Sequence, residues 1–256
     1  MRRLILLAAL LLPLSLMAQE YSWETVRMDG SRTAAVKDGK TKVKVKANSS
    51  AAKVMKLVEA AQPAMARVKE VIGYSTEAIS KGYPESALSN WTVDTIMEKV
   101  ESLAGKKVHV GFGNFGGIRV DMPQGDILLD DILSMFPFRN NLVYLELKGS
   151  TLRSIFEWMA STHVQPIGGV KVVIEKGKLE SLHIDGQPVD DEKVYGVATN
   201  SFLLNGGDGF YLGKDALVKV IYDDLVQDAM LESIRKTTAA GKAFEYKKDG
   251  RVVIKK

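Results

Sequence analysis

Hydrophobic positions in the first half of the chain follow a helical spacing in two segments. Asn48-Ser49-Ser50 offers an N-cap to a helical pattern whose apolar residues share one face (Val54, Leu57, Val58 and Ala61). We expect Pro63 to break or restart this helix, because proline lacks a backbone N–H. A second helix is predicted after Pro84-Glu85-Ser86, with Gly105 as its stop. Its apolar residues are spaced for burial (Trp91, Ile96, Met97, Val100 and Leu103).

Short apolar runs predict strands in the second half of the chain. Strand patterns cover residues 108–112, 142–147 and 194–199. Between them, Ser150 to Ala160 predicts an amphipathic helix that buries four apolar residues (Leu152, Ile155, Phe156 and Met159).

A hairpin and a long helix complete the predicted pattern. Residues 170–174 and 179–184 flank a turn that contains Gly177, a residue that adopts positive φ without strain. A long helix is predicted over 225–240, followed by a final strand pair around Lys247 to Gly250. The predicted class is α+β, with mixed or antiparallel sheets layered with helices.

The N-terminus has the pattern of a secretory signal peptide. Arg2 and Arg3 precede an apolar run from Leu4 to Leu16, and a small residue follows at Ala18. The run is interrupted by Pro13 and is shorter than the roughly 20 residues that span a bilayer, so we expect no stable membrane anchor. Residues 1–18 are therefore expected to be removed by cleavage near Ala18, which makes the protein periplasmic or secreted.

The remaining sequence divides into an extension and a main domain. We expect residues 19–80 to form a strand and a helix that pack on a main domain over 81–256. The chain has no cysteine, so packing rather than disulfides must stabilise it. Without Arg2 and Arg3 the chain has 33 basic and 31 acidic residues, a near-balance that predicts no bulk affinity for nucleic acid. The basic run 37–46 alternates with valines, as a solvated edge strand does.

Three glycine-rich turns are the first candidates for chemistry. They cover residues 114–119, 167–170 and 205–210. Glycines let a backbone approach a ligand closely, but each turn by itself favours a purely structural role. The polar and aromatic residues beside these glycines make a binding role worth considering.

Five side chains in or near these turns have the chemistry of nucleotide recognition. Arg119 carries a permanent charge suited to a phosphate, a carboxylate or a ribose edge, although a surface ion pair is the simpler role. Asn114 offers both a donor and an acceptor to a base edge. Phe138 and Phe202 lie in loop-like contexts, where two rings could sandwich a planar base. Asp208 could accept hydrogen bonds from sugar hydroxyls or could cap its own turn.

The order of these motifs resembles one known family. NFGGIR, FPFRNN, a Gly-Gly pair and NSFLLNGGDGF follow one another between Pro84 and Gly213. Together they are similar to the C-terminal, substrate-binding domain of the 5′-nucleotidase and UDP-sugar hydrolase family. ESALSN at residues 85–90 and LKGSTL at 147–152 also resemble segments of that domain. The resemblance implies the fold of that domain.

The resemblance also implies roles for individual residues. It places a nucleobase between Phe138 and Phe202, and it assigns Asn114 and Arg119 to the base and to the ribose or phosphate. Asp208 would bind ribose hydroxyls. Three further positions are implied to line the base pocket (Asn140, Gly168 and Gly169).

Two positions depart from the family pattern. The family typically has an arginine where this chain has Pro84, and a glycine where it has Phe115. The loss of one cation puts tight phosphate binding in question. We hypothesise that Arg139, beside Phe138, replaces the missing charge.

The family hydrolyses phosphate esters in a separate two-metal domain, and its metal-binding motifs do not occur in this sequence. The histidines are His109, His163 and His183, of which the first and last lie in strand patterns that favour a surface or structural role. We therefore expect no cofactor in this chain and divalent metals only in a partner metallophosphoesterase, as in a split 5′-nucleotidase. The alternatives are a stand-alone nucleoside- or nucleotide-binding protein and a fold that has lost binding.

Overall fold

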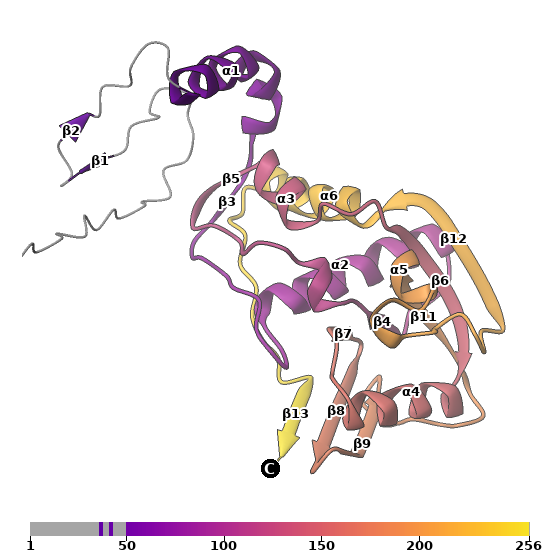
Figure 1. Ribbon diagram of the computed structural model, residues 1–256. Coiled ribbons are helices and arrows are strands. Elements are labelled where there is room, and N and C mark those ends of the chain that lie inside the picture. The colour runs from indigo at the N-terminus through magenta and orange to yellow at the C-terminus, as the bar shows by residue number, and fades with distance from the viewer. Residues whose placement is uncertain (1–35, 38–40, 43–49, 256) are drawn as a thin grey trace, which may run out of the picture. The chain divides into compact units, whose positions relative to one another are not determined.

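The computed structural model describes residues 36–37, 41–42 and 50–255, which form parts of two compact units (Figure 1). The first unit ends at Met65. It contains β1 (Val36–Lys37), which pairs antiparallel with β2 (Thr41–Lys42), and the helix α1 (Ser50–Met65). The predicted signal peptide and most of the predicted edge strand over 37–46 lie outside the described residues.

Helix α1 runs through Pro63, so the predicted break at that residue is wrong. Pro63 lies in the last turn of the helix, where the missing N–H removes one of the final backbone hydrogen bonds. The helix ends two residues later and continues as the 3₁₀ turn η1 (Ala66–Lys69). The proline therefore affects the end of the helix rather than its middle.

A five-stranded mixed sheet lies at the centre of the second unit, which covers Ala66 to Lys256. Its order is β12 (Val218–Leu225), β6 (Asn141–Lys148), β11 (Val194–Asn200), β4 (Val110–Phe112) and β7 (Ile167–Gly168). β4 and β11 run parallel, and the other neighbours run antiparallel. The strands predicted over 108–112, 142–147 and 194–199 are confirmed by β4, β6 and β11.

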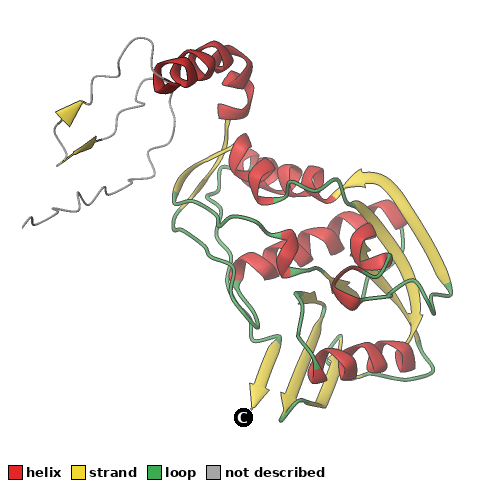
Figure 2. Ribbon diagram, viewed as in Figure 1, coloured by secondary structure: helices red, strands yellow, loops and turns green. Residues whose placement is uncertain are grey.

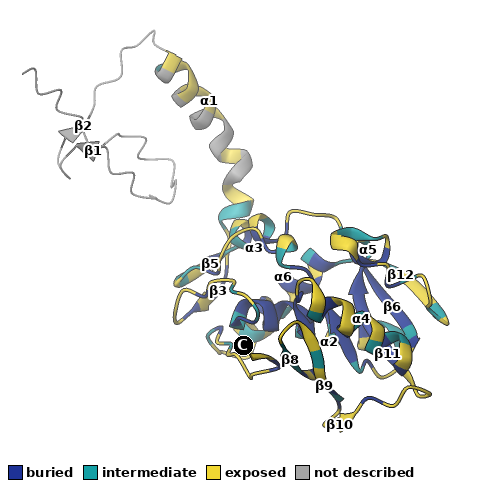
Figure 3. Cartoon of the chain, turned by 60° about the horizontal axis from the view of Figure 1, so that its bottom comes forward, coloured by how far each residue is buried: buried dark blue, intermediate teal, exposed yellow. Residues whose placement is uncertain are grey.

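Both faces of this sheet are covered, as Figures 1 and 2 show. Side chains of β6 alternate, so that Leu142 and Tyr144 join one core cluster while Val143 and Leu145 join the other. The helices α2 (Ala87–Ala104) and α6 (Val226–Ala239) contribute to the first cluster, and α4 (Gly149–Ser161) contributes to the second. Figure 3 shows the resulting burial of β6 and β11.

The helices confirm the predicted spacing. α2 begins after Ser86, whose side chain accepts a hydrogen bond from the Ser89 N–H, and it ends at Gly105 with φ 60°. Trp91 and Ile96 are buried on it. In the described part of the chain, no helix is both long and apolar enough to span a membrane.

A second sheet packs against α4 with four strands. Its order is β10 (Gln187–Pro188), β9 (Lys178–Ile184), β8 (Val170–Glu175) and β13 (Val252–Lys255). The predicted hairpin of β8 and β9 is confirmed, with positive φ at Lys176 and Gly177. The strand pair predicted around Lys247 to Gly250 is wrong, because β13 pairs in parallel with β8. The N–H groups of Asp249 and Gly250 donate instead to the Glu85 carboxylate.

Shorter elements complete the second unit and connect the central strands. β3 (Val71–Ser75) pairs antiparallel with β5 (Gly125–Leu128), which leads into α3 (Leu129–Met135). The turns η2 (Phe115–Gly117), α5 (Ser201–Leu204) and η3 (Gly207–Gly209) follow central strands. The α+β class is confirmed. The domain boundary predicted between residues 80 and 81 stays a prediction, with β3 inside the compact unit that begins at Ala66.

Candidate functional site

A shallow hollow lies where three central strands meet one edge of the sheet. β4 and β11 run parallel, so their carboxyl ends lie at the same edge, and the antiparallel β6 begins there. The residues that line the hollow come from α2, from the segments around these strand ends and from the start of α6 (Thr92, Ile96, Gly113, Asn114, Gly117, Ile118, Phe136, Phe138, Asn140, Asn200 and Val226). Three of the predicted site residues, Asn114, Phe138 and Asn140, are therefore brought together.

Asn114 is held at the hollow by the turn η2. The residue is 8% exposed, and its side chain does not cap the turn that it precedes. A Cβ on Gly117 would lie 2.8 Å from the Asn114 Oδ1, so the glycine is what allows the amide to lie over the turn. Phe115 N–H donates to the Gln165 Oε1 at 3.0 Å and fixes the next residue. The Asn114 amide thus has a defined position and no side-chain hydrogen bond to another described residue.

Arg119 lies beside the ring of Phe138. The guanidinium carbon is 5.7 Å from the ring centroid, within cation–π distance, and Nη1 donates to the Gly116 carbonyl at 3.1 Å. Phe138 remains 46% exposed. Arg119 and Arg139 are both exposed, and neither forms an ion pair with an acidic residue in the described part of the chain. The surface ion pair considered for Arg119 is therefore absent among the described residues. Both cations can receive an anion.

Phe202 projects from α5 directly after β11. Asn200 accepts a hydrogen bond from the Leu203 N–H and so caps this short turn. The ring of Phe202 lies on Gly207, where an added Cβ would be 2.4 Å from a ring carbon. Phe202 is 40% exposed. The glycine-rich motif therefore holds a flat, accessible ring.

Asp208 lies in η3 with φ 53°, in the left-handed region, and its side chain is exposed. The glycines on both sides pack against aromatic rings. A Cβ on Gly206 would lie 2.6 Å from the Tyr211 ring, and one on Gly209 would lie 3.1 Å from Trp158. The Asp208 carboxylate accepts no hydrogen bond from the described part of the chain, and the turn is closed by the Gly209 N–H, which donates to the Gly206 carbonyl at 3.2 Å. Its carboxylate remains able to accept hydrogen bonds from a ligand.

Gly168 and Gly169 lie apart from the hollow. A Cβ on Gly168 would lie 2.6 Å from the Met97 sulfur, and one on Gly169 would lie 2.0 Å from the His109 carbonyl oxygen. The two glycines therefore allow β7 to pack tightly on α2 and β4. Their assignment to a base pocket stays a prediction.

Sequence reasoning missed several lining residues. Thr92 and Ile96 are four residues apart on α2 and so share the helix face that closes the hollow. The spacing of Ile96 predicted burial, but it could not indicate that the same face borders a cavity. Asn140 was assigned by resemblance, and its backbone carbonyl accepts a hydrogen bond from the Val226 N–H at 2.9 Å, which joins the two sides of the hollow.

The histidine just before β4 has a structural role. His109 Nδ1 accepts a hydrogen bond from the Gly196 N–H at 3.0 Å, and burial together with the nearby Lys107 lowers the pKa of His109. Among the described residues, no group of three or more His, Asp or Glu side chains could hold a metal ion.

The sequence profile of the family described as "5′-nucleotidase, C-terminal domain" matches residues 59–214, more than half of the chain. The chain belongs to this family. "Protein UshA" of Yersinia enterocolitica is 30% identical over 145 residues, which are 55% of this chain and 26% of that protein. "Probable 5′-nucleotidase" of Treponema pallidum is 30% identical over 190 residues, 66% of this chain and 32% of that protein.

Solved structures of the family share the fold. A 5′-nucleotidase precursor from Thermus thermophilus superimposes with a TM-score of 0.69 at 25% identity, over 79% of this chain and 43% of that one. The NAD nucleotidase of Haemophilus influenzae gives a TM-score of 0.60 at 19% identity, over 79% of this chain and 40% of that chain. This chain therefore spans about a quarter to a third of the curated relatives and less than half of the similar structures.

Proposed function

We propose that the protein recognises a nucleotide or nucleoside in the hollow at the ends of β4 and β11. The observation that carries this proposal is the Asn114 amide, which lines the hollow and makes no hydrogen bond to a described residue, together with two exposed rings, Phe138 at the hollow and Phe202 on α5. A planar base stacks on such rings, and an amide offers its edge a donor and an acceptor. Asp208 would then bind the ribose hydroxyls.

The relatives support this ligand class. The names "Probable 5′-nucleotidase" and "5′-nucleotidase precursor" describe proteins that act on nucleotides. This chain is similar to part of each of them. For the phosphate we propose Arg119 and Arg139, two exposed guanidinium groups beside Phe138. Arginine is suited to phosphate because its planar fork donates two parallel hydrogen bonds.

We further propose that the domain presents its nucleotide to a separately encoded metallophosphoesterase, which would hydrolyse the phosphate ester. The motifs that hold two metals in the family do not occur in the sequence, whereas the recognition motifs do. The N-terminal pattern around Leu4 to Leu16 supports a meeting of the two proteins outside the cytoplasm. A stand-alone binding protein is the second candidate, and high affinity of the isolated protein would favour it.

Isothermal titration with adenosine and AMP tests recognition. Phe138→Ala should weaken the affinity for both ligands by about tenfold, because it removes one base–aromatic stack. Tyr74→Ala is the matched control, since Tyr74 is a similarly exposed ring on β3, 51% against 46%. Equal affinity of wild type and Phe138→Ala would overturn the proposal. So would a wild-type protein that binds neither adenosine nor AMP.

The contribution of the phosphate is tested by Arg139→Ala. AMP affinity should fall several-fold while adenosine affinity stays the same, because adenosine has no phosphate. Arg235→Ala, which removes an exposed arginine of α6, is the control. The partner is tested separately, by adding a purified metallophosphoesterase and measuring phosphate release from AMP. If phosphate release is no faster than with the phosphoesterase alone, the result counts against a split enzyme. A stand-alone binding protein then remains as the proposed function.

A further inference from the structure

The two edges of the central sheet are built differently. At one edge, β7 has two residues, both buried, and the Ile167 carbonyl accepts a hydrogen bond from Arg251 at 3.0 Å. At the other edge, β12 has eight residues, and among the described strands it pairs with β6 alone (Figure 1). A long edge strand offers a row of backbone N–H and C=O groups to which another strand can pair. β12 is therefore the open edge of this sheet.

β12 combines this open edge with exposed apolar side chains. Val220 is 38% exposed and Ile221 is 53% exposed, and Leu217, directly before the strand, is 56% exposed. Val218 and Tyr222, by contrast, pack against the core cluster to which α2 and α6 contribute. Exposed apolar side chains on an open edge favour pairing with another strand.

The charges on the two sides of this apolar segment are opposite in sign. Lys219 and Asp223 are both exposed, and neither forms an ion pair with another residue in the described part of the chain. They stand two positions before and two positions after Ile221. If two β12 strands pair antiparallel with Ile221 opposite Ile221, Lys219 of each strand lies opposite Asp223 of the other. Opposite charges in directly opposed positions stabilise an antiparallel pair. The strand is thus complementary to itself.

β13, at the edge of the second sheet, has similar exposure but a different charge pattern. Val253 and Ile254 are each 42% exposed. An antiparallel pair of two β13 strands centred on Val253 would place Arg251 opposite Lys255, which are like charges. Lys255 moreover forms an ion pair with Glu180 of its own chain at 2.7 Å. Exposure alone therefore does not select a second copy as the partner of an edge strand, whereas the charges of β12 do.

We propose that two copies of this protein associate through β12, in an antiparallel pair with a two-fold axis at Ile221. The central sheets of the two copies then continue across the axis, and each copy contributes the same surface, as in other closed two-fold dimers. The pairing covers the apolar side chains of β12 and forms two ion pairs between Lys219 and Asp223. None of these residues lines the hollow, so the inference does not depend on the proposed recognition of a nucleotide.

Reversal of the two charges tests the dimer, with sedimentation velocity as the measurement. The wild type should have twice the mass of one chain. Lys219→Asp and Asp223→Lys should each raise the dissociation constant of the dimer at least about tenfold, because each puts two pairs of like charges into the interface. The double variant Lys219→Asp/Asp223→Lys should restore the wild-type value. Lys248→Asp, which reverses an exposed charge far from β12 in sequence, is the control and should leave the dimer unchanged.

A cysteine at the axis tests the register of the pair. The chain has no cysteine of its own, so Ile221→Cys introduces one thiol per copy. Directly opposed residues of an antiparallel pair have Cβ atoms about 4.5–5.5 Å apart, close enough for a disulfide to form under mild oxidation. Ile221→Cys should therefore give a covalent dimer on a non-reducing gel. Ile254→Cys, at a similarly exposed position of the edge strand β13, is the matched control and should give none.

The outcomes separate this inference from the proposed function. A wild type that stays monomeric overturns the dimer and leaves β12 to another partner or to none. A dimer that both single reversals leave intact, or that the double variant does not restore, also overturns it. So does equal cross-linking of Ile221→Cys and Ile254→Cys. Adenosine affinity should be the same in the wild type and in the charge variants, so a failure of nucleotide recognition would appear in the titration of the wild type whatever its mass.

Discussion

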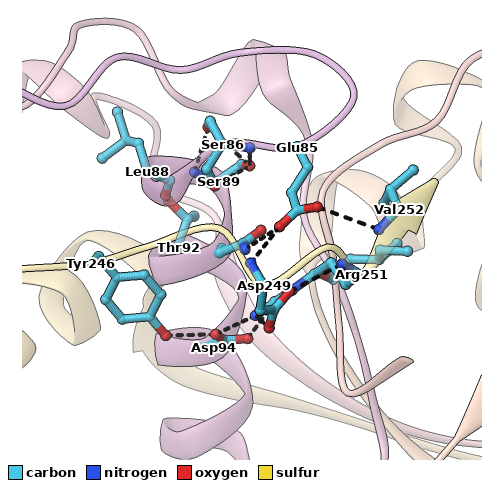
Figure 4. A network of polar contacts seen from close by, with 12 residues as sticks. Glu85, Ser86, Leu88, Ser89, Thr92, Asp94, Tyr246, Asp249, Arg251 and Val252 are labelled. Atoms are coloured by element: carbon cyan, nitrogen blue, oxygen red, sulfur yellow. Dashed lines mark hydrogen bonds and ion pairs between the residues drawn. The ribbon is translucent and has the colours of Figure 1, made fainter. Parts of the chain in front are cut away.

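Two regions of the second unit bury polar side chains, and they differ in how these are satisfied. One is the hollow around Asn114. The other is the network around α2, in which Glu85 and Asp94 bond Asp249 and Arg251 of the C-terminal segment (Figure 4). Burying a polar group costs free energy unless a hydrogen-bond partner is present. The two regions differ in whether the protein itself supplies these partners.

The network satisfies its members within the protein. Arg251, 7% exposed, donates to Asp94 at 2.7 and 2.9 Å, to Asp249 at 2.7 Å and to the Ile167 carbonyl at 3.0 Å. Tyr246 donates its hydroxyl to Asp94 at 2.6 Å, and burial and this hydrogen bond raise the pKa of Tyr246. The network joins β13, α2 and β7, so we expect it to stabilise the fold.

The hollow leaves its amide without a side-chain partner. As a whole residue Asn114 is about as buried as Arg251, 8% against 7% exposed, but no described residue bonds its amide, whose polar atoms are accessible from the hollow. A ligand in the hollow can therefore bond the amide directly, whereas the members of the network already bond one another. The comparison teaches that the exposure of a polar residue does not tell whether it serves the fold or a ligand. Its hydrogen-bond partners do.

The largest effect is expected from breaking the network with Arg251→Met. This change removes a buried cation and leaves Asp94 and Asp249 without it, so the free energy of unfolding should fall by about 3 kcal/mol. Chemical denaturation with urea measures the change. Adenosine affinity of the folded protein should remain as in the wild type, because the hollow keeps all its lining residues.

A surface pair provides the control for this prediction. Arg235→Met breaks the pair with Glu70, whose atoms are 3.5 Å apart and whose side chains are both about half exposed, so it should cost less than about 1 kcal/mol. Similar losses in Arg251→Met and Arg235→Met would show that the buried network contributes no more than an exposed pair.

Much of the fold could be predicted because local signals agree with it. Ser86 and Gly105 bound α2 as cap residues, and the alternation in β6 reflects a sheet with two covered faces. The C-terminal strand could not be predicted in this way. Its parallel pairing with β8 depends on residues far away in sequence, and Glu85 holds Asp249 across 164 positions.

The candidate site shows the same division. Phe138 and Phe202 stood out because large rings occurred without a periodic reason for burial, and both are exposed. The contact between the rings of Tyr83, Phe115 and His163 could not be predicted, since they meet only when three loops fold together. No spacing in a sequence reports such a meeting.

A smaller effect is expected from Gly207→Ala, which changes the packing of Phe202. The added Cβ would lie 2.4 Å from the Phe202 ring, so the ring must move away from its present position. Because Phe202 is exposed and can swing outward, we expect the unfolding free energy to fall by less than about 1 kcal/mol. Adenosine affinity, measured by titration, should fall by roughly threefold to tenfold as the stack is lost.

The control for this glycine is Gly82→Ala. There the added Cβ would lie 3.7 Å from the Ser86 Cβ, an ordinary contact distance. Adenosine affinity should be unchanged. An unchanged affinity in Gly207→Ala as well would mean that the position of Phe202 does not matter for binding, and the base clamp would lose one of its two sides.

The smallest effect is expected from Asp249→Asn, and it depends on pH. The hydrogen bond from Arg251 lowers the pKa of Asp249 in the folded protein, so the carboxylate stabilises the fold above the unfolded value of about 3.9 and this contribution is lost as pH falls through the folded pKa. The side chain is 54% exposed, which limits the effect at pH 7 to less than about 1 kcal/mol. Urea unfolding should therefore find Asp249→Asn less stable than wild type at pH 7, with the difference shrinking below pH 4. Asp215→Asn, a change at an exposed aspartate, should show no comparable difference at pH 7. A difference for Asp249→Asn that stays constant between pH 7 and pH 3 would assign its effect to packing, and the network would then stabilise the fold through shape more than through charge.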